Sequence, residues 1–172
     1  LLTVLEDWTN ILDDRGTINN VYMDFLKAFD KVPHQRLLLK LKNYGITGNV
    51  WKWVEKFLVG RKQRVTVQGE FSEWSDVKSG IPQGTVLGPL LFVLFINDLP
   101  EVVSEGTEVY LFADDTKLYR RIDEEEDCRI LQEDLKSLLD WSDKWLLKFH
   151  PDKCKIIEIG PNKINYDYKL GD

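Results

Sequence analysis

The sequence has 172 residues, of which 43% are hydrophobic and 30% charged, a balance typical of one folded globular domain and not of a disordered chain. Lys and Arg number 23 against 29 Asp and Glu, so the net charge of −6 argues against a protein that holds nucleic acid by bulk charge alone. With only Cys128 and Cys154, a disulfide framework and a four-cysteine zinc site are excluded, and a reducing intracellular compartment, cytoplasm or nucleus, is favoured.

The longest apolar stretch, residues 86–96, is broken by Gly88 and Pro89. It is shorter than the roughly 20 residues that cross a bilayer, so we expect no membrane span. No signal peptide is visible at the N-terminus, which lacks a basic segment followed by an apolar block. The sequence also lacks a starting Met, and we expect it to be part of a longer protein.

Hydrophobic spacing and turn residues predict the elements of the first half of the chain. The expected elements are a helix up to about Asp14, a buried strand over 20–25, helices that start at Pro33 and after Thr47, and a hairpin with arms 64–68 and 71–77.

In the second half, a glycine-bearing loop over 79–88 leads into an apolar helix that runs to about Asn97. Further expected elements are strands 108–113 and 117–121, a long helix 124–149, a strand 155–159, and the first arm of a hairpin at 166–170. This order predicts an α+β fold, in a single domain over 1–172, with helices packed on one face of an antiparallel sheet.

Acidic residues stand where they are unfavourable. Asp24 lies inside the otherwise apolar string 21–25, and Asp114 and Asp115 follow another apolar strand. An ionised carboxylate at the end of a buried strand is costly unless it is paired or binds a cation. Two such strand ends placed side by side would make an oxygen site suited to Mg²⁺. The alternative is that Asp114-Asp115 is a hairpin turn, and that Asp24 pairs with a Lys or a helix N-terminus.

The loop 79–88 contains three glycines and a proline and ends where a helix begins. Such residues fix an unusual backbone path, and the amide groups of a helix N-terminus favour phosphate. Gln83 in this loop can donate and accept hydrogen bonds at once. Alternatively, the glycines and prolines only punctuate a connection.

Several strings across the chain, in the same order, resemble the reverse transcriptase domain of non-LTR (LINE-type) retrotransposons, particularly the jockey and CR1-like group. They are YMDFLKAFDKVPH at 22–34, GRKQRV at 60–65, SGIPQG at 79–84, LGPLLF at 87–92, FINDLP at 95–100, FADDTKL at 112–118 and WLLKFHPDKCK at 145–155. The resemblance implies a polymerase palm with part of the fingers.

The resemblance implies a catalytic centre in which Asp24, Asp114 and Asp115, with the backbone carbonyl of Phe25, hold two Mg²⁺ ions, with Mn²⁺ as the alternative ion. Lys153 matches a lysine that protonates the leaving pyrophosphate. A solvated lysine at the start of a strand is the alternative for Lys153.

The resemblance also implies residues that contact substrates. Phe29 falls at the steric-gate position that excludes a ribose 2′-hydroxyl, or else it is a core residue. Gln83 and Gly84 match residues that line the nucleotide pocket and the template. The basic residues Arg61, Lys62 and Arg64 are expected to bind nucleic acid, or else to be a solvated surface.

The implied partners are an RNA template, a DNA primer and deoxynucleoside triphosphates, together with fingers and thumb regions that the sequence does not contain. The expected activity is that of an RNA-directed DNA polymerase. One alternative is an inactive retrotransposon remnant that acts as a binding or structural module. Another is a related palm enzyme, such as a group II intron maturase or a viral RNA polymerase. Phe29 argues against an RNA polymerase, which needs a residue that admits the 2′-hydroxyl. Tyr168-Lys169-Leu170-Gly171 resembles the start of the primer-grip hairpin.

Overall fold

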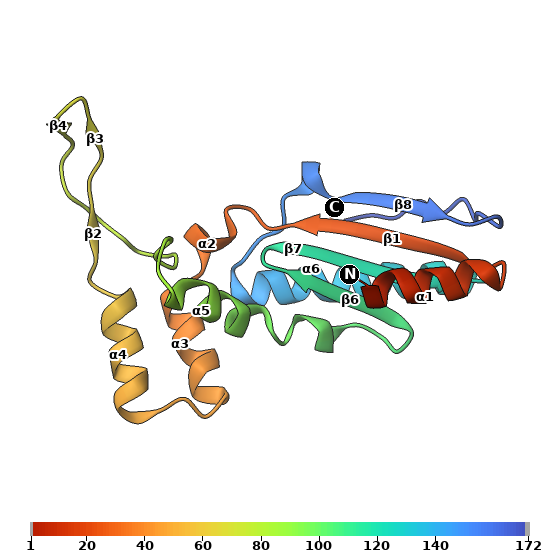
Figure 1. The fold of residues 1–172 in the computed structure, drawn as a ribbon, viewed down its shortest axis with the longest axis horizontal. Helices are drawn as coiled ribbons and strands as arrows, with labels where there is room; N and C mark the ends of the chain where they lie inside the picture. Colours follow the sequence, from red (N-terminus) through yellow and green to blue (C-terminus); the bar gives the residue numbers. More distant parts are fainter. Residues whose placement is uncertain (1, 171–172) are drawn as a thin grey trace. The chain divides into compact units, whose positions relative to one another are not determined.

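The computed structural model describes residues 2–170, which fold as two compact units (Figure 1). The first unit contains the chain up to Leu26, residues 98–144 and the residues from Lys148 onward. The second contains residues 27–97 and 145–147. The prediction of one domain over 1–172 stays a prediction. Among the described residues, no helix combines the length and the apolar character needed to cross a membrane.

The first unit is built on a four-stranded antiparallel sheet with the strand order β6-β7-β1-β8. The strands are β1 (Thr17–Asp24), β6 (Thr107–Phe112), β7 (Asp115–Ile122) and β8 (Lys155–Ile159). The predicted α+β class and antiparallel, palm-like sheet are confirmed. Strand β1 extends further toward the N-terminus than predicted, because Thr17 and Asn19 are as deeply buried as its apolar residues.

Helices α1 (Leu2–Asp13) and α6 (Glu125–Trp145) cover this sheet, with the short 3₁₀ turns η1 (Leu99–Val102) and η2 (Pro151–Lys153) in its connections. Val4 of α1 packs with Ile18 and Tyr119. Figure 1 shows α1 in front of the sheet and α6 behind it. The prediction placed the helices on one face. Here they take both faces, because side chains on both faces of β1 are buried.

Helix α6 is shorter than the predicted 124–149. The helix begins at Glu125, and the carboxylate of Asp127 in its first turn accepts the backbone N–H groups of Asp123 and Glu124 just before it. The helix ends at Trp145, and Leu146 then adopts a left-handed backbone with φ of 58°. Residues 166–170 form no strand, and Gly171 of the expected primer-grip hairpin lies outside the described residues.

The second unit contains α2 (Ala28–Lys31), α3 (His34–Asn43), α4 (Gly48–Leu58) and α5 (Leu87–Ile96). Helices α3, α4 and α5 confirm the predicted positions to within two residues. Helix α5 is almost wholly apolar, and a buried lysine of α3 binds a backbone carbonyl in its last turn. The Lys40 ammonium donates to the carbonyl of Phe95 at 2.6 Å and lies 3.9 Å from the centre of the Trp145 ring.

Two short antiparallel ladders form an arm between α4 and the glycine-bearing loop. Strand β2 (Lys62–Gln63) pairs with β5 (Ser75–Asp76), and β3 (Thr66–Val67) pairs with β4 (Glu70–Phe71). The turn lies at Gln68 and Gly69, both with positive φ, close to the predicted position. All residues of these four strands are exposed.

Candidate active site

Two of the predicted carboxylates meet at one end of the sheet in the first unit. Asp24 is the last residue of β1 and stands in register opposite Asp115, the first residue of β7. Directly opposed residues in an antiparallel pair have Cβ atoms about 5 Å apart and point to the same face. The side chain of Asp24 is 22% exposed. The β1–β7 register therefore places two carboxylates side by side at the edge of the core.

The third carboxylate lies in the turn between β6 and β7. Ala113 adopts a left-handed backbone with φ of 54°, which lets the chain reverse within two residues. Asp114 follows in the turn, and Asp115 begins the next strand, opposite Phe112. The turn therefore lies between Phe112 and Asp115, and Asp115 is a strand residue and not part of it.

Lys153 brings a positive charge to this end of the sheet. Its ammonium donates to Oδ2 of Asp24 at 2.5 Å. The pKa of Lys153 is raised, first by this hydrogen bond and by the charge of Asp24, and further by the charges of Asp114 and Asp115. The ammonium thus interacts electrostatically with all three predicted carboxylates and stays protonated at neutral pH.

The segment after α6 holds Lys153 in place. The N–H of Leu26 donates to the carbonyl of Lys148 at 2.7 Å, and the N–H of His150 donates to the carbonyl of Asp24 at 2.7 Å. Between these two bonds, the Phe25 ring stacks on the Phe149 ring at 4.5 Å. This antiparallel bridge ties the turn η2, and with it Lys153, to the end of β1. The bridge uses the carbonyl of Asp24 and not that of Phe25.

The chemistry of these groups suits a hard cation, since carboxylate oxygens are the ligands that Mg²⁺ and Mn²⁺ take in proteins. The Lys153 ammonium on Asp24 shows that a cation can rest there. Within residues 2–170, however, no three His, Cys, Asp or Glu side chains are already grouped as a metal site. The carboxylates are the type of ligand that the metal takes, and the Lys153 ammonium occupies Oδ2 of Asp24, one of the oxygens that such an ion would use.

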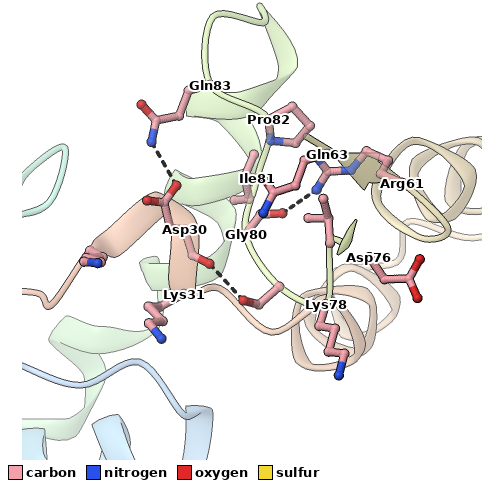
Figure 2. A pocket seen from close by; sticks show the side chains of 13 residues that line it. Asp30, Lys31, Arg61, Gln63, Asp76, Lys78, Gly80, Ile81, Pro82 and Gln83 are labelled. Carbon is pink, nitrogen blue, oxygen red and sulfur yellow. Dashed lines mark hydrogen bonds between the residues drawn. The ribbon is translucent and has the colours of Figure 1, made fainter. Parts of the chain in front are cut away.

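The second unit contains a polar cavity of about 490 Å³ (Figure 2). Its wall is the stretch 76–83, faced by side chains from α2 and from the start of the arm. Charged and amide side chains dominate the lining. They are Lys27, Asp30, Lys31, Arg61, Gln63, Asp76, Lys78 and Gln83.

The wall of this cavity is fixed at Gly80. Its φ is +91°, and a Cβ added there would lie 2.7 Å from the carbonyl oxygen of Asp30, so only glycine fits. Its carbonyl accepts a hydrogen bond from Nη2 of Arg61 at 2.8 Å and lies 2.8 Å from Nε2 of His34. Burial lowers the pKa of His34, and the charge of Arg61 adds to this, against the hydrogen bond to Gly80. His34, the first residue of α3, therefore contacts the wall at Gly80 without lining the cavity itself.

The substrate-contact residues predicted in this unit take different positions. Gln83 faces the cavity, and Gly84, with φ of +77°, follows it at an open position. The Phe29 ring stacks on Phe92 of α5 at 4.6 Å and is half-buried. Its role as a steric gate stays a prediction.

Of the basic residues, Lys62 and Arg64 are exposed on the arm. The guanidinium of Arg64 lies over the rings of Phe71 at 3.8 Å and Trp74 at 4.7 Å. Arg61 instead donates to the carbonyls of Leu58 and Gly80, so two of its donor groups are used within the unit. That these three residues bind nucleic acid stays a prediction.

Sequence reasoning missed Asp30. Its Oδ1 accepts a hydrogen bond from Nε2 of Gln83 at 3.0 Å, and its carbonyl accepts one from Oγ of Ser79 at 2.9 Å (Figure 2). Asp30 lies inside the string 22–34, and a carboxylate six residues after Asp24 was the available signal. The pairing with a loop about 50 residues away has no signature in the sequence.

Comparison with known proteins agrees with the expected family. Residues 10–166 match the family model described as "Reverse transcriptase (RNA-dependent DNA polymerase)". The probable RNA-directed DNA polymerase from transposon BS of Drosophila melanogaster is 34% identical over 154 residues, which cover 82% of this chain and 16% of the relative. The polymerase from mobile element jockey of Drosophila funebris is 33% identical, covering 83% and 16%. The chain therefore spans about one sixth of these relatives.

Solved structures of telomerases share the fold. Apo telomerase from Candida tropicalis aligns with a TM-score of 0.70 at 12% identity, covering 95% of this chain and 35% of that one. Telomerase from Candida albicans aligns with a TM-score of 0.69 at 11% identity, covering 96% and 31%. At such identities the likeness concerns the fold alone.

Proposed function

Because the chain belongs to the reverse transcriptase family, we propose that it supplies the catalytic carboxylates of an RNA-directed DNA polymerase. The reaction is the transfer of a nucleotide to the 3′-hydroxyl of a primer. The observation that carries the proposal is the register pairing of Asp24 with Asp115, with a lysine ammonium on Asp24.

The residues that would hold divalent ions are Asp24, Asp114 and Asp115, with the carbonyl of Phe25. Bound Mg²⁺ or Mn²⁺ would supply charge neutralisation for the triphosphate and acidify the primer hydroxyl. The β1–β7 pairing keeps Asp24 and Asp115 at a fixed separation, so the chain's contribution is preorganisation. Lys153 holds a proton on Nζ at neutral pH and can give it to a leaving phosphate oxygen.

The proposed substrates are an RNA template, a DNA primer and deoxynucleoside triphosphates, with Phe29, Gln83 and Gly84 at the nucleotide. Lys62 and Arg64, exposed on the arm, are suited to phosphate contacts. Fingers and thumb regions would complete the enzyme. We place its work inside the cell, in cytoplasm or nucleus, where its templates and nucleotides occur.

Primer extension tests the proposal. The substrate is an oligo(dT) primer on a poly(A) template with dTTP and Mg²⁺, and the enzyme is the longest natural protein that contains this chain. We expect Asp24→Asn and Asp115→Asn to reduce extension by about 10²- to 10³-fold, since each removes a charge aimed at the reacting phosphates. Glu133→Gln, an exposed change on α6, is the control. Extension that survives Asp24→Asn at the wild-type rate would refute the proposal and favour an inactive remnant.

A further inference from the structure

The hydrogen bond between Asp30 and Gln83 has a defined direction. A carboxylate only accepts, so the Gln83 atom 3.0 Å from Oδ1 of Asp30 must be the amide nitrogen. Figure 2 shows the result, with the nitrogen turned toward Asp30 and the oxygen away from it. Both side chains are exposed, so a ligand can reach this oxygen.

From this geometry we infer that Asp30 is a positioning residue that sets which end of the Gln83 amide faces a ligand. With Nε2 held by Asp30, Gln83 presents Oε1, an acceptor, and recognises a donor group. This inference rests on the proposed function, in which Gln83 contacts the incoming nucleotide. Asp30 then acts on the nucleotide through Gln83, without touching it.

The path of the loop does not depend on the Asp30 carboxylate. The N–H of Gly80 donates to the carbonyl of Val32 and that of Ile81 to the carbonyl of Phe29, both at 2.8 Å. The Ser79 hydroxyl binds the backbone carbonyl of Asp30, which any residue at position 30 would keep. Asp30→Asn therefore leaves the loop in place and removes only the constraint on the amide. An asparagine can donate or accept, so Gln83 becomes free to present either end.

The first test observes the amide directly in the 172-residue chain. The side-chain NH₂ signals of Gln83 are assigned in a ¹⁵N-labelled sample by their loss in Gln83→Ala. In Asp30→Asn we expect them to move toward the positions of solvent-exposed glutamines, whereas Glu55→Gln, a matched acid-to-amide change in the same unit, leaves them in place. Gln83 signals that do not respond to Asp30→Asn would overturn the inference.

The second test measures the consequence in primer extension by the longest natural protein that contains this chain. We expect Asp30→Asn to raise the KM for dTTP about tenfold, the scale of one hydrogen bond that involves a charged group, with little change in kcat. The Kd for the template–primer stays unchanged. In a Gln83→Ala background, Asp30→Asn should change the KM less than about twofold, because Asp30 affects the nucleotide only through the Gln83 side chain.

Two outcomes contradict the inference. One is an effect of Asp30→Asn that is equally large with and without Gln83. The other is a change in template–primer Kd with an unchanged KM. If the wild-type protein extends no primer, the proposed function fails, and the amide signals alone then decide whether Asp30 orients Gln83.

Discussion

The two units of the chain carry opposite charges. Residues 27–97 contain eleven Lys and Arg against five Asp and Glu, a net charge of +6 at pH 7. The rest of the chain contains twelve basic and twenty-four acidic residues, a net charge of −12. The acidic unit holds the three carboxylates of the candidate centre, and the basic unit holds the exposed arm and the Gly80 loop. The charge of −6 for the whole chain is the sum of these two opposite net charges.

Each unit also buries an ion of the sign it carries in excess. The acidic unit buries Asp134, which accepts the N–H of Ser104 at 2.8 Å and the hydroxyl of Thr107 at 2.5 Å. The basic unit buries Lys40 at the end of α5. In both cases hydrogen bonds compensate for lost hydration, so the charges stabilise local structure and are not available to substrate.

The largest change in stability is expected in the basic unit, at Gly80. Gly80→Ala should lower the free energy of unfolding by about 3 kcal/mol, because the left-handed backbone and the contact with Asp30 both exclude a Cβ. Gly84→Ala is the matched control, since Gly84 also has positive φ but open space, and should cost about 1 kcal/mol. Urea unfolding measures both. An equal decrease in the free energy of unfolding for both variants would mean that the loop 79–88 does not pack on α2 at Gly80.

In the acidic unit, Asp134→Ala should lower the free energy of unfolding by about 2 to 3 kcal/mol, since it leaves the N–H of Ser104 and the hydroxyl of Thr107 without their acceptor. The exposed neighbour Glu133 serves as control, with an expected change for Glu133→Ala within about 0.5 kcal/mol. If thermal or urea unfolding gives the two variants the same stability, Asp134 does not anchor the loop before β6.

A third prediction concerns nucleic acid, where the two units should differ. Reversing the charge at Lys62 and Arg64 should reduce the slope of log Kd against log salt for an RNA–DNA hybrid by about 1.5, because each phosphate contact contributes about 0.7 to 0.9. Reversing Lys136 and Lys163, exposed in the acidic unit, should leave the slope unchanged. Fluorescence anisotropy over a salt series measures this. A slope that responds equally to both pairs would place the interface elsewhere.

The smallest effect is expected from pH. Burial lowers the pKa of His34 in the folded chain below its ordinary 6.5, so the unfolded chain binds a proton more readily. The contribution of His34 is therefore complete above pH 6.5 and is lost as the pH falls from there to the folded pKa. His34→Gln should reduce the loss of stability below pH 6.5 in urea titrations. An unchanged pH profile would show that His34 is not buried against Gly80.

Much of the fold could be predicted from the sequence. The apolar stripes of α3 and α4 and the β-prone run of β8 are strong local signals, and their positions are confirmed. The end of α6 was misplaced, because Trp145 and Phe149 continue the apolar spacing of the stripe that predicted the helix. Phe149 instead stacks on Phe25, a contact more than 100 residues distant in sequence. Such tertiary contacts override local propensity.

In the candidate site too, some residues could be predicted from the sequence and some contacts could not. Asp24, Asp114 and Asp115 could be singled out because carboxylates are rare at the ends of buried strands, and the family strings support them. The sequence left open that Asp24 pairs with a lysine, and the structure identifies this lysine as Lys153. The bond from Gln83 to Asp30 could not be predicted, because it joins α2 to a loop about 50 residues later in the chain. The internal use of Arg61 had no signal either, since its sequence neighbours are exposed basic residues.

Binding of Mn²⁺ to the 172-residue chain, followed by electron paramagnetic resonance, tests most directly whether the end of β1 is a cation site. We expect Asp24→Asn to weaken binding by about tenfold or more, and Lys153→Met to strengthen it, because no ammonium then competes for Asp24. Glu133→Gln should bind as the wild type does. Wild-type affinity in Asp24→Asn, or weaker binding in Lys153→Met, would contradict the account.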